Sequence, residues 1–133
     1  MSADNVCYLD ASALTKLVAV EAESRALRSF LRRLPNRCTS ALAYVEVIPA
    51  ARIKGEPVVP HARRVLRRTT LLEIEDAVLE VASRLDPVRL RSLDAIHLAA
   101  ALALGPALDA VVTYDRRMRD AALALGLPVE APA

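Results

Sequence analysis

Short apolar runs alternate with longer segments of helical periodicity along this chain, and this alternation constrains its fold more than any other feature. The runs at 6–9 and 110–113 are mostly apolar, as strands buried on both faces of a sheet usually are. In the segment 11–20, Leu14, Leu17 and Val18 recur at the spacing of one helix face. Strands that alternate with helices predict an α/β domain with a parallel sheet.

The same pattern assigns most of the chain to an element. We expect strands at 6–9, 37–39, 70–74, 110–113 and 127–130. We expect helices at 11–20, 21–34, 40–54, 60–68, 76–85, 92–104 and 116–125. Ser92 should cap the helix that it begins, and Gly55 and Gly126 should end the helices before them. Pro49 lies inside an expected helix, where it removes a backbone hydrogen bond and should cause a kink.

The length and composition predict one domain that spans residues 1–133. A chain of 133 residues with 54% hydrophobic and 26% charged residues can bury one core. It has no apolar stretch of about 18 residues, which a transmembrane helix needs, and its first residues do not resemble a signal peptide. We therefore expect a cytoplasmic protein with no membrane partner. Cys7 and Cys38 are expected to be buried reduced thiols, because the sequence has no paired Cys or His spacing for zinc.

Four acidic residues lie where the predicted fold would bring them together. Asp10 and Asp115 follow apolar runs, at the carboxyl ends of two expected strands. Asp94 lies in the first turn of a later helix, and Glu46 lies about two turns into an earlier one. Ligands of open parallel sheets bind beyond the carboxyl ends of the strands. We therefore expect these four carboxylates to line one crevice.

Carboxylates that share a crevice favour a divalent cation. Two such groups about 4 Å apart repel each other by about 4 kcal/mol at an effective dielectric constant of 20. Either some of them take up protons or a hard cation neutralises them. Mg²⁺ or Mn²⁺ suits a site of oxygen ligands, and such an ion can lower the pKa of a bound water and hold a phosphate.

Each of the four acids also has an ordinary structural explanation. Asp10 and Asp115 could each cap the helix that follows. Asp94 could stabilise the start of its own helix, and Glu46 could be an exposed helix residue. Taken together, the four residues fit one site better than four separate coincidences.

The two histidines are expected to have structural roles. His97 follows Asp94 by one helical turn, in a run that otherwise contains Ala, Ile and Leu. This position is compatible with a general base, but a packed and hydrogen-bonded histidine is the more common case. His61 precedes a basic helix and is expected at the surface.

Arginine supplies nearly all of the positive charge, although the net charge is only +2. The arginines form three clusters: Arg25, Arg28, Arg32, Arg33 and Arg37; Arg63, Arg64, Arg67 and Arg68; and Arg116, Arg117 and Arg119. Guanidinium groups suit phosphates, although a single cluster is usually a solvated helix face. The third cluster borders Asp115, so Arg116 is our candidate for holding a substrate phosphate. Aromatic residues make up only 3% of the chain, which leaves little for base stacking.

Four segments carry a resemblance to a known family. They are YLDASALTKL at 8–17, SALAYVE at 40–46, LDAIHLAAA at 93–101 and VTYDRRM at 112–118. In this order they resemble the PIN domain, and most of all the VapC-type toxins of bacterial toxin–antitoxin pairs. The resemblance spans nearly the whole chain. It implies a PIN-like three-layer α/β sandwich, with a short parallel sheet in the order 3-2-1-4-5 flanked by helices.

The resemblance also implies an activity and its residues. It implies an endoribonuclease that depends on Mg²⁺ or Mn²⁺, is inhibited by a cognate VapB-type antitoxin and forms a homodimer. The acidic set of the family falls on Asp10, Glu46, Asp94 and Asp115. The hydroxyls of the family fall on Ser12 and Thr113, which could hold a carboxylate or a metal-bound water. Asp10 and Asp94 would be the principal metal ligands. Substitution of either should abolish cleavage while leaving the fold intact or more stable, because repulsion is relieved.

Two other functions were weighed against this hypothesis. Phosphatases of the haloacid dehalogenase type need a second aspartate two residues after the first, where this chain has Ser12, so that class is excluded. The remaining alternative is a catalytically degenerate PIN fold that only binds RNA or an antitoxin. In either case, the apolar residues within 11–34 offer a surface that could accept an antitoxin helix.

Overall fold

The computed structural model describes residues 5–133, and its centre is a five-stranded sheet. The strands are β1 (Val6–Leu9), β2 (Arg37–Ser40), β3 (Thr70–Leu72), β4 (Leu108–Val112) and β5 (Val129–Glu130). They lie in the order β3-β2-β1-β4-β5, and every pairing is parallel. The predicted α/β class and the strand order are therefore confirmed.

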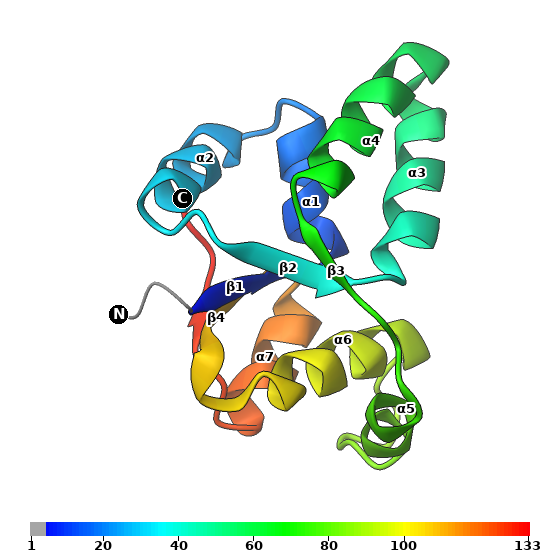
Figure 1. Cartoon of the computed structure of the whole chain (residues 1–133), viewed down its shortest axis with the longest axis vertical. Helices are drawn as coiled ribbons and strands as arrows, with labels where there is room; N and C mark the ends of the chain where they lie inside the picture. Colours follow the sequence, from blue (N-terminus) through cyan, green and yellow to red (C-terminus); the bar gives the residue numbers. More distant parts are fainter. Residues whose placement is uncertain (1–4) are drawn as a thin grey trace.

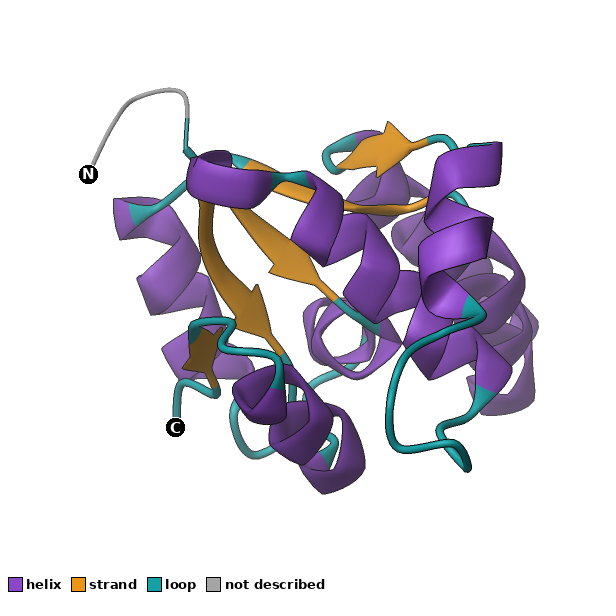
Figure 2. Cartoon of the chain, turned by 90° about the horizontal axis from the view of Figure 1, so that it is seen from below, coloured by secondary structure: helices purple, strands orange, loops and turns teal. Residues whose placement is uncertain are grey.

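Helices cover both faces of the sheet, which gives three layers (Figure 1). One layer contains α1 (Ala11–Val18), α2 (Ser24–Arg33), α3 (Ala43–Lys54) and α4 (Val59–Arg67). The other contains α5 (Asp76–Ala82), α6 (Ser92–Ala103) and α7 (Arg116–Ala124). Short 3₁₀ turns lie at Glu56–Val58 and Gly105–Ala107. Figure 2 shows the same sheet between purple helices in a second view.

The central strand is buried on both of its faces. Cys7, Tyr8 and Leu9 of β1 have no exposed surface. Cys7 and Leu9 pack with α1–α4, whereas Tyr8 packs with Ala101 of α6 and with the neighbouring strands. Successive side chains of a strand point to opposite faces, so a strand between two helical layers has to be apolar throughout. This requirement explains the continuous apolar run in the sequence.

The two thiols and the helical segment 11–34 contribute to the core. Cys7 and Cys38 are buried and free, as expected, and burial raises the pKa of Cys7 to about 11 and that of Cys38 to about 12. The apolar residues of α1 and α2 pack against α3, α4 and the sheet. Phe30 and Leu34 are packed against the same core, whereas Val20, just after α1, is 89% exposed.

Several element boundaries differ from the prediction. The helix expected at 40–54 begins at Ala43, because Ser40 completes β2 and its Oγ accepts a hydrogen bond from the Leu42 amide at 3.1 Å. Glu46 therefore lies in the first turn of α3, not two turns into it. The helix continues through Pro49 to Lys54, and the exposed proline does not end it.

Two other helix ends test the predicted capping residues. Ser92 is the first residue of α6, and the cap position belongs to Arg91, whose side chain makes no capping bond. The prediction for Ser92 was therefore wrong by one position. Gly126 follows α7 with φ of +77°, a conformation that glycine adopts without steric cost. No helix in the described part of the chain is long and apolar enough to cross a membrane.

Candidate active site

The four acidic residues line one pocket at the carboxyl-terminal edge of the sheet. Its volume is about 240 Å³, and Asp10, Glu46, Asp94 and Asp115 all contribute to its wall. Asp10 follows β1, and Asp115 lies shortly after β4, which pairs with β1. Glu46 and Asp94 come from the first turns of α3 and α6. Residues from four separate parts of the chain thus meet in one place.

Asp10 is the most enclosed of the four carboxylates and is held by three donors. It is 3% exposed. Its Oδ1 accepts hydrogen bonds from Ser12 Oγ at 2.6 Å and from the Ala13 amide at 3.0 Å. Its Oδ2 accepts one from Thr113 Oγ1 at 2.5 Å. Burial raises the pKa of Asp10, and the three hydrogen bonds oppose that shift because they favour the ionised form. Asp10 also caps α1, which confirms the structural explanation given for it.

The two hydroxyls beside Asp10 connect the ends of β1 and β4. Ser12 Oγ accepts a hydrogen bond from the Tyr114 amide at 2.9 Å, and Thr113 Oγ1 accepts one from the Asp115 amide at 3.1 Å. Each hydroxyl has a single proton, and both protons are directed to the Asp10 carboxylate. The orientation of this carboxylate is therefore fixed by two neighbouring strand ends.

Glu46 is held by a chain of hydrogen bonds that begins in β2. The Ser40 amide donates to Tyr8 Oη at 3.1 Å, which leaves the Tyr8 proton to be donated to His97 Nδ1 at 2.6 Å. Burial raises the pKa of Tyr8 and so keeps that proton in place. His97 then donates from Nε2 to Glu46 Oε1 at 2.6 Å.

His97 is 2% exposed and hydrogen-bonded at both ring nitrogens, so the expectation of a packed structural histidine is confirmed. Its contact with Glu46 was not foreseen. The one-turn spacing from Asp94 placed His97 near the site, but nothing local in the sequence indicates a partner on another helix. His61, expected at the surface, is half-buried, and its Nε2 lies 3.2 Å from the Leu17 carbonyl oxygen.

Asp94 and Asp115 have fewer partners than Asp10 and Glu46. Asp115 caps α7, and its Oδ1 accepts hydrogen bonds from the amides of Arg117 at 2.8 Å and Met118 at 3.4 Å. Within residues 5–133, neither Asp115 Oδ2 nor the Asp94 side chain accepts a hydrogen bond. Burial raises the pKa of Asp94, and the negative charge of Asp115 raises it further, while Arg91 opposes both effects. The wall formed by these two residues therefore has an excess of negative charge.

The donor set suits a hard cation. As the side chains lie, no three Asp, Glu, His or Cys residues of the described chain are grouped closely enough to hold a metal ion by themselves. Mg²⁺ does not require such a group, because it usually keeps several waters and binds through one or two carboxylates and a substrate phosphate. The exposed oxygens of Asp94 and Asp115, with Asp10 beside them, match that mode of binding.

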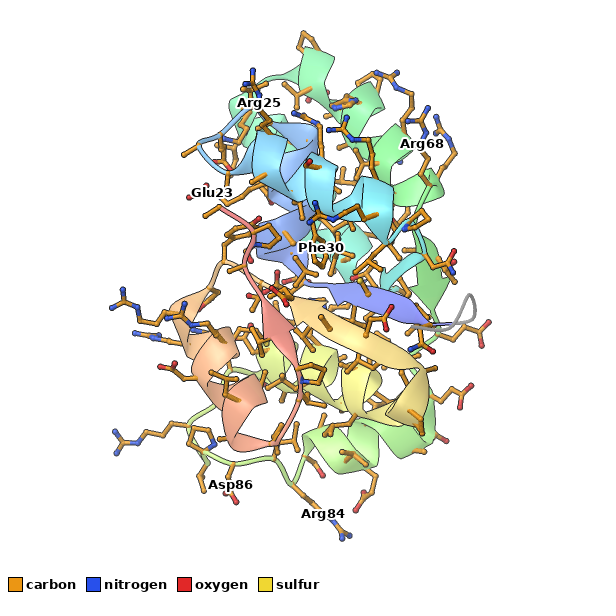
Figure 3. The ribbon with its side chains drawn as sticks, turned by 90° about the vertical axis from the view of Figure 1, so that its left-hand side faces the viewer. Glu23, Arg25, Phe30, Arg68, Arg84 and Asp86 are labelled. Carbon is orange, nitrogen blue, oxygen red and sulfur yellow. The ribbon has the colours of Figure 1, made fainter. Side chains whose placement is uncertain are left out.

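The positive charge nearest the acids comes from a residue that the sequence did not single out. Arg91 lines the acidic pocket, directly before α6. Arg116 lies on the exposed side of the first turn of α7 and lines a neighbouring hollow with Asp115 and Arg119. The other two clusters lie farther away: Arg25 and Arg68 project outward from the layer that contains α2 and α4 (Figure 3).

Comparison with known proteins identifies the family. The sequence model of the PIN domain matches residues 7–123. The chain belongs to the PIN domain family. It is 50% identical over 125 residues to "Ribonuclease VapC46" of Mycobacterium tuberculosis, an alignment that covers 94% of this chain and 96% of that protein. It is 43% identical over 129 residues to "Ribonuclease VapC35" of the same species, again over 94% and 96% of the two chains.

Solved structures support the same fold for this PIN domain. The crystal structure of Mycobacterium tuberculosis VapC20, described as a toxin that cleaves the sarcin–ricin loop, superposes with a TM-score of 0.75. The sequences are 18% identical, over 96% of this chain and 99% of that one. A toxin–antitoxin complex from Klebsiella pneumoniae gives a TM-score of 0.74 at 22% identity, over 96% and 98% of the chains.

Proposed function

We propose that this PIN domain is an endoribonuclease that depends on Mg²⁺ or Mn²⁺ and hydrolyses RNA phosphodiester bonds at Asp10, Glu46, Asp94 and Asp115. The pocket in which these four carboxylates meet carries the proposal. Identity of 50% to a protein named as a ribonuclease supports the reaction. All of the candidate ligands are oxygens, as these ions prefer.

Each acidic residue of the pocket has its own role in the proposed reaction. A bound ion would supply a water of lowered pKa and would stabilise the charge that develops on the scissile phosphate. Asp10 and Asp94 would hold the ion, and the hydrogen bonds from Ser12 and Thr113 fix the orientation of the Asp10 carboxylate. Asp115 completes the acidic wall. Glu46, whose Oε1 is held by His97, orients the attacking water through Oε2 and accepts its proton there.

The biological setting follows from the relatives. We propose that the chain is the toxin of a toxin–antitoxin pair, is inhibited by a cognate VapB-type antitoxin, forms a homodimer and acts in the cytoplasm. The VapC names of its relatives and a structural neighbour described as a toxin–antitoxin complex support this setting. Arg116, beside Asp115 on the first turn of α7, is suited to bind a phosphate that flanks the cleaved one.

One observation favours the alternative of a binding module without catalysis. In the described part of the chain, no three potential ligands are grouped closely enough to hold an ion without water or substrate. A degenerate PIN fold that only binds RNA or an antitoxin would be compatible with that arrangement. The two functions differ in whether RNA is turned over and whether an ion binds.

The test is cleavage of a panel of structured RNAs by purified full-length protein with Mg²⁺, with Mn²⁺ and with EDTA. Asp10→Asn is the test variant, and Asp76→Asn, an exposed aspartate in the first turn of α5, is the matched control. The proposal expects metal-dependent cleavage that Asp10→Asn abolishes and Asp76→Asn retains. RNA binding without metal binding or cleavage would contradict it and support the binding module. Cleavage that persists in EDTA would contradict the role of the ion.

A further inference from the structure

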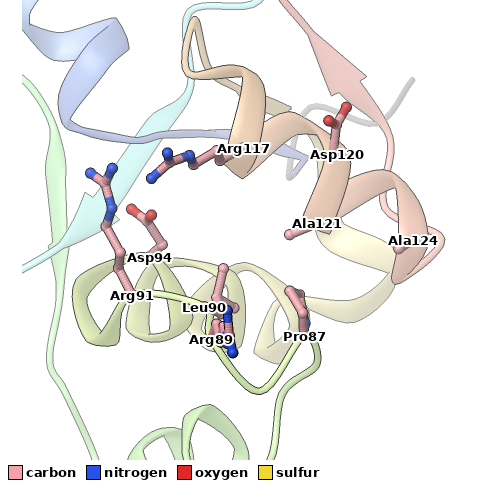
Figure 4. Close-up of a pocket in the computed structure, with 9 residues that line it drawn as sticks. All are labelled: Pro87, Arg89, Leu90, Arg91, Asp94, Arg117, Asp120, Ala121 and Ala124. Atoms are coloured by element: carbon pink, nitrogen blue, oxygen red, sulfur yellow. The ribbon is translucent and has the colours of Figure 1, made fainter.

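A second and larger hollow lies directly beside the acidic pocket. Its volume is about 450 Å³, within the ~300–1,000 Å³ range of small-molecule pockets. It lies between α7 and the segment that leads into α6 (Figure 4). Asp94 and Arg91 line both hollows, so the two adjoin each other. A polymer held in the acidic pocket would extend into this space.

The walls of the second hollow are mainly apolar. Pro87 and Leu90 come from the segment before α6, and Ala121 and Ala124 face them from α7 (Figure 4). Leu90 and Ala121 also belong to a small core cluster with Leu98, which gives these walls a fixed foundation. Small and branched side chains on opposite walls leave a space suited to a flat group with apolar faces.

Two arginines and one aspartate lie at the end of the hollow nearest the acidic pocket. The side chains of Arg91 and Arg117 extend toward Asp94 at this end (Figure 4). Within residues 5–133 neither arginine forms a salt bridge and both are exposed, and the charge of Arg91 also acts on Asp94. Two unpaired guanidinium groups beside an apolar hollow match a ligand that joins a phosphate to a flat ring.

We propose that this hollow is a subsite for the nucleotide next to the scissile phosphate, with its phosphate between Arg91 and Arg117 and its base between the apolar walls. The inference rests on the proposed ribonuclease function and specifies part of its substrate site. None of the described residues that line the hollow is aromatic, so the base packs against aliphatic groups and the planes of the arginines. The subsite therefore selects for a base at one position of the RNA, in addition to the charge of the backbone.

A binding experiment tests the base separately from the phosphate. The amide resonances of ¹⁵N-labelled full-length protein are followed during titration with AMP, GMP, CMP or UMP, and with ribose 5-phosphate as the matched ligand without a base. At least one mononucleotide should shift the amides of Leu90, Ala121 and Ala124, and it should bind roughly fivefold more tightly than ribose 5-phosphate. Equal shifts with ribose 5-phosphate, or shifts confined to residues 25–33, would overturn the proposal.

A pair of variants tests the subsite in the reaction. Ala124→Trp places a large ring in the hollow, and Ala103→Trp places the same ring outside it; both alanines are exposed and end their helices. For an RNA that the wild type cleaves, Ala124→Trp should lower kcat/KM roughly tenfold, and Ala103→Trp should not change it. If Ala124→Trp cleaves the RNA with the kcat/KM of the wild type, the proposed subsite is overturned and the ribonuclease function is not affected. If a mononucleotide binds at Leu90 and Ala121 but the protein cleaves no RNA, the subsite is supported and the proposed function is contradicted.

Discussion

The two walls of the acidic pocket differ in how their carboxylates are held. On one wall, Asp10 accepts three hydrogen bonds and Glu46 is held by His97, which Tyr8 positions in turn. On the other, Asp94 accepts no hydrogen bond within residues 5–133, and Asp115 uses only one oxygen, to cap α7.

The first wall is therefore distinguished by its fixed geometry, and the second by its unrelieved charge. The first wall has its geometry before any ligand arrives, because buried donors fix it at both strand ends. The second wall retains like charges that raise the pKa of Asp94, and only a proton or a cation can relieve their repulsion. We call Asp10 and Glu46 the anchored wall, and Asp94 and Asp115 the open wall. Under the proposed function, the anchored wall sets the geometry of the reaction and the open wall responds to the ion.

The largest expected effect is on cleavage by an Asp94→Asn variant. Under the proposed function, this change removes a metal ligand from the open wall, and cleavage should fall by at least about 100-fold, beyond the 10–100-fold cost of losing an outer-shell partner. The measurement is the single-turnover rate on an RNA that the wild type cleaves. Asp76→Asn, on the exposed surface of α5, should cleave as the wild type does. Metal-dependent cleavage at a near-normal rate in Asp94→Asn would remove Asp94 from the ligand set.

Stability should separate the two walls more directly than activity. Asp10→Ala removes the cap of α1 and leaves the Ala13 amide and the Thr113 hydroxyl without their acceptor, so the free energy of unfolding should fall by about 1–3 kcal/mol. Asp94→Ala loses no hydrogen bond and relieves repulsion from Asp115, so its stability should equal or exceed that of the wild type. Urea denaturation without metal measures both. An equal loss in the two variants would remove the distinction between the walls.

The sequence alone suggested that substitution of either aspartate would leave the fold intact or more stable. The stability prediction for Asp94 agrees with this, and the one for Asp10 differs from it. The apolar runs and helical periodicities predicted the parallel sheet, because strands buried on both faces have a distinctive composition. The family resemblance predicted the strand order. Asp10 and Asp115 were singled out because they follow expected strands, and Asp94 because it begins an expected helix. Glu46 was placed about two turns into its helix.

What the sequence did not predict depends on contacts between distant residues. The link from Tyr8 through His97 to Glu46 joins β1, α6 and α3, and no single segment indicates it. The start of α3 was placed too early because Ser40 continues β2, a choice set by pairing with β3. Arg91 was missed because its proximity to the acids depends on how α6 packs against the sheet.

A smaller effect is expected from Tyr8→Phe, which tests how firmly the anchored wall is held. The phenyl ring keeps the packing of Tyr8 but removes the hydroxyl, so the Ser40 amide and His97 Nδ1 lose their partner. The free energy of unfolding should fall by about 1–2 kcal/mol. The cleavage rate should fall by less than in Asp94→Asn, because Glu46 remains in the pocket with a less constrained His97. Tyr114→Phe is the control, since the Tyr114 hydroxyl donates to the Pro132 carbonyl at 2.7 Å, outside this chain of contacts. A cleavage rate of Tyr8→Phe equal to that of the wild type would show that the orientation of Glu46 does not depend on Tyr8.

The smallest expected effect is on the pH dependence of stability, and it comes from the open wall. Burial and the charge of Asp115 raise the pKa of Asp94, so the folded protein binds this proton more tightly than the unfolded chain does. Ionised Asp94 therefore destabilises the fold at neutral pH, and its penalty should disappear as the pH falls through the raised pKa toward about 4, the ordinary range of an aspartate. Asp94→Asn should be more stable than the wild type near pH 7, and this advantage should shrink on acidification, as urea denaturation at a series of pH values would show. Added Mg²⁺ should reduce the advantage at neutral pH, because it neutralises the charge that the substitution removes. An advantage that is independent of pH and of Mg²⁺ would mean that Asp94 is not under electrostatic strain, and the open wall would then differ from the anchored one only in its hydrogen bonds.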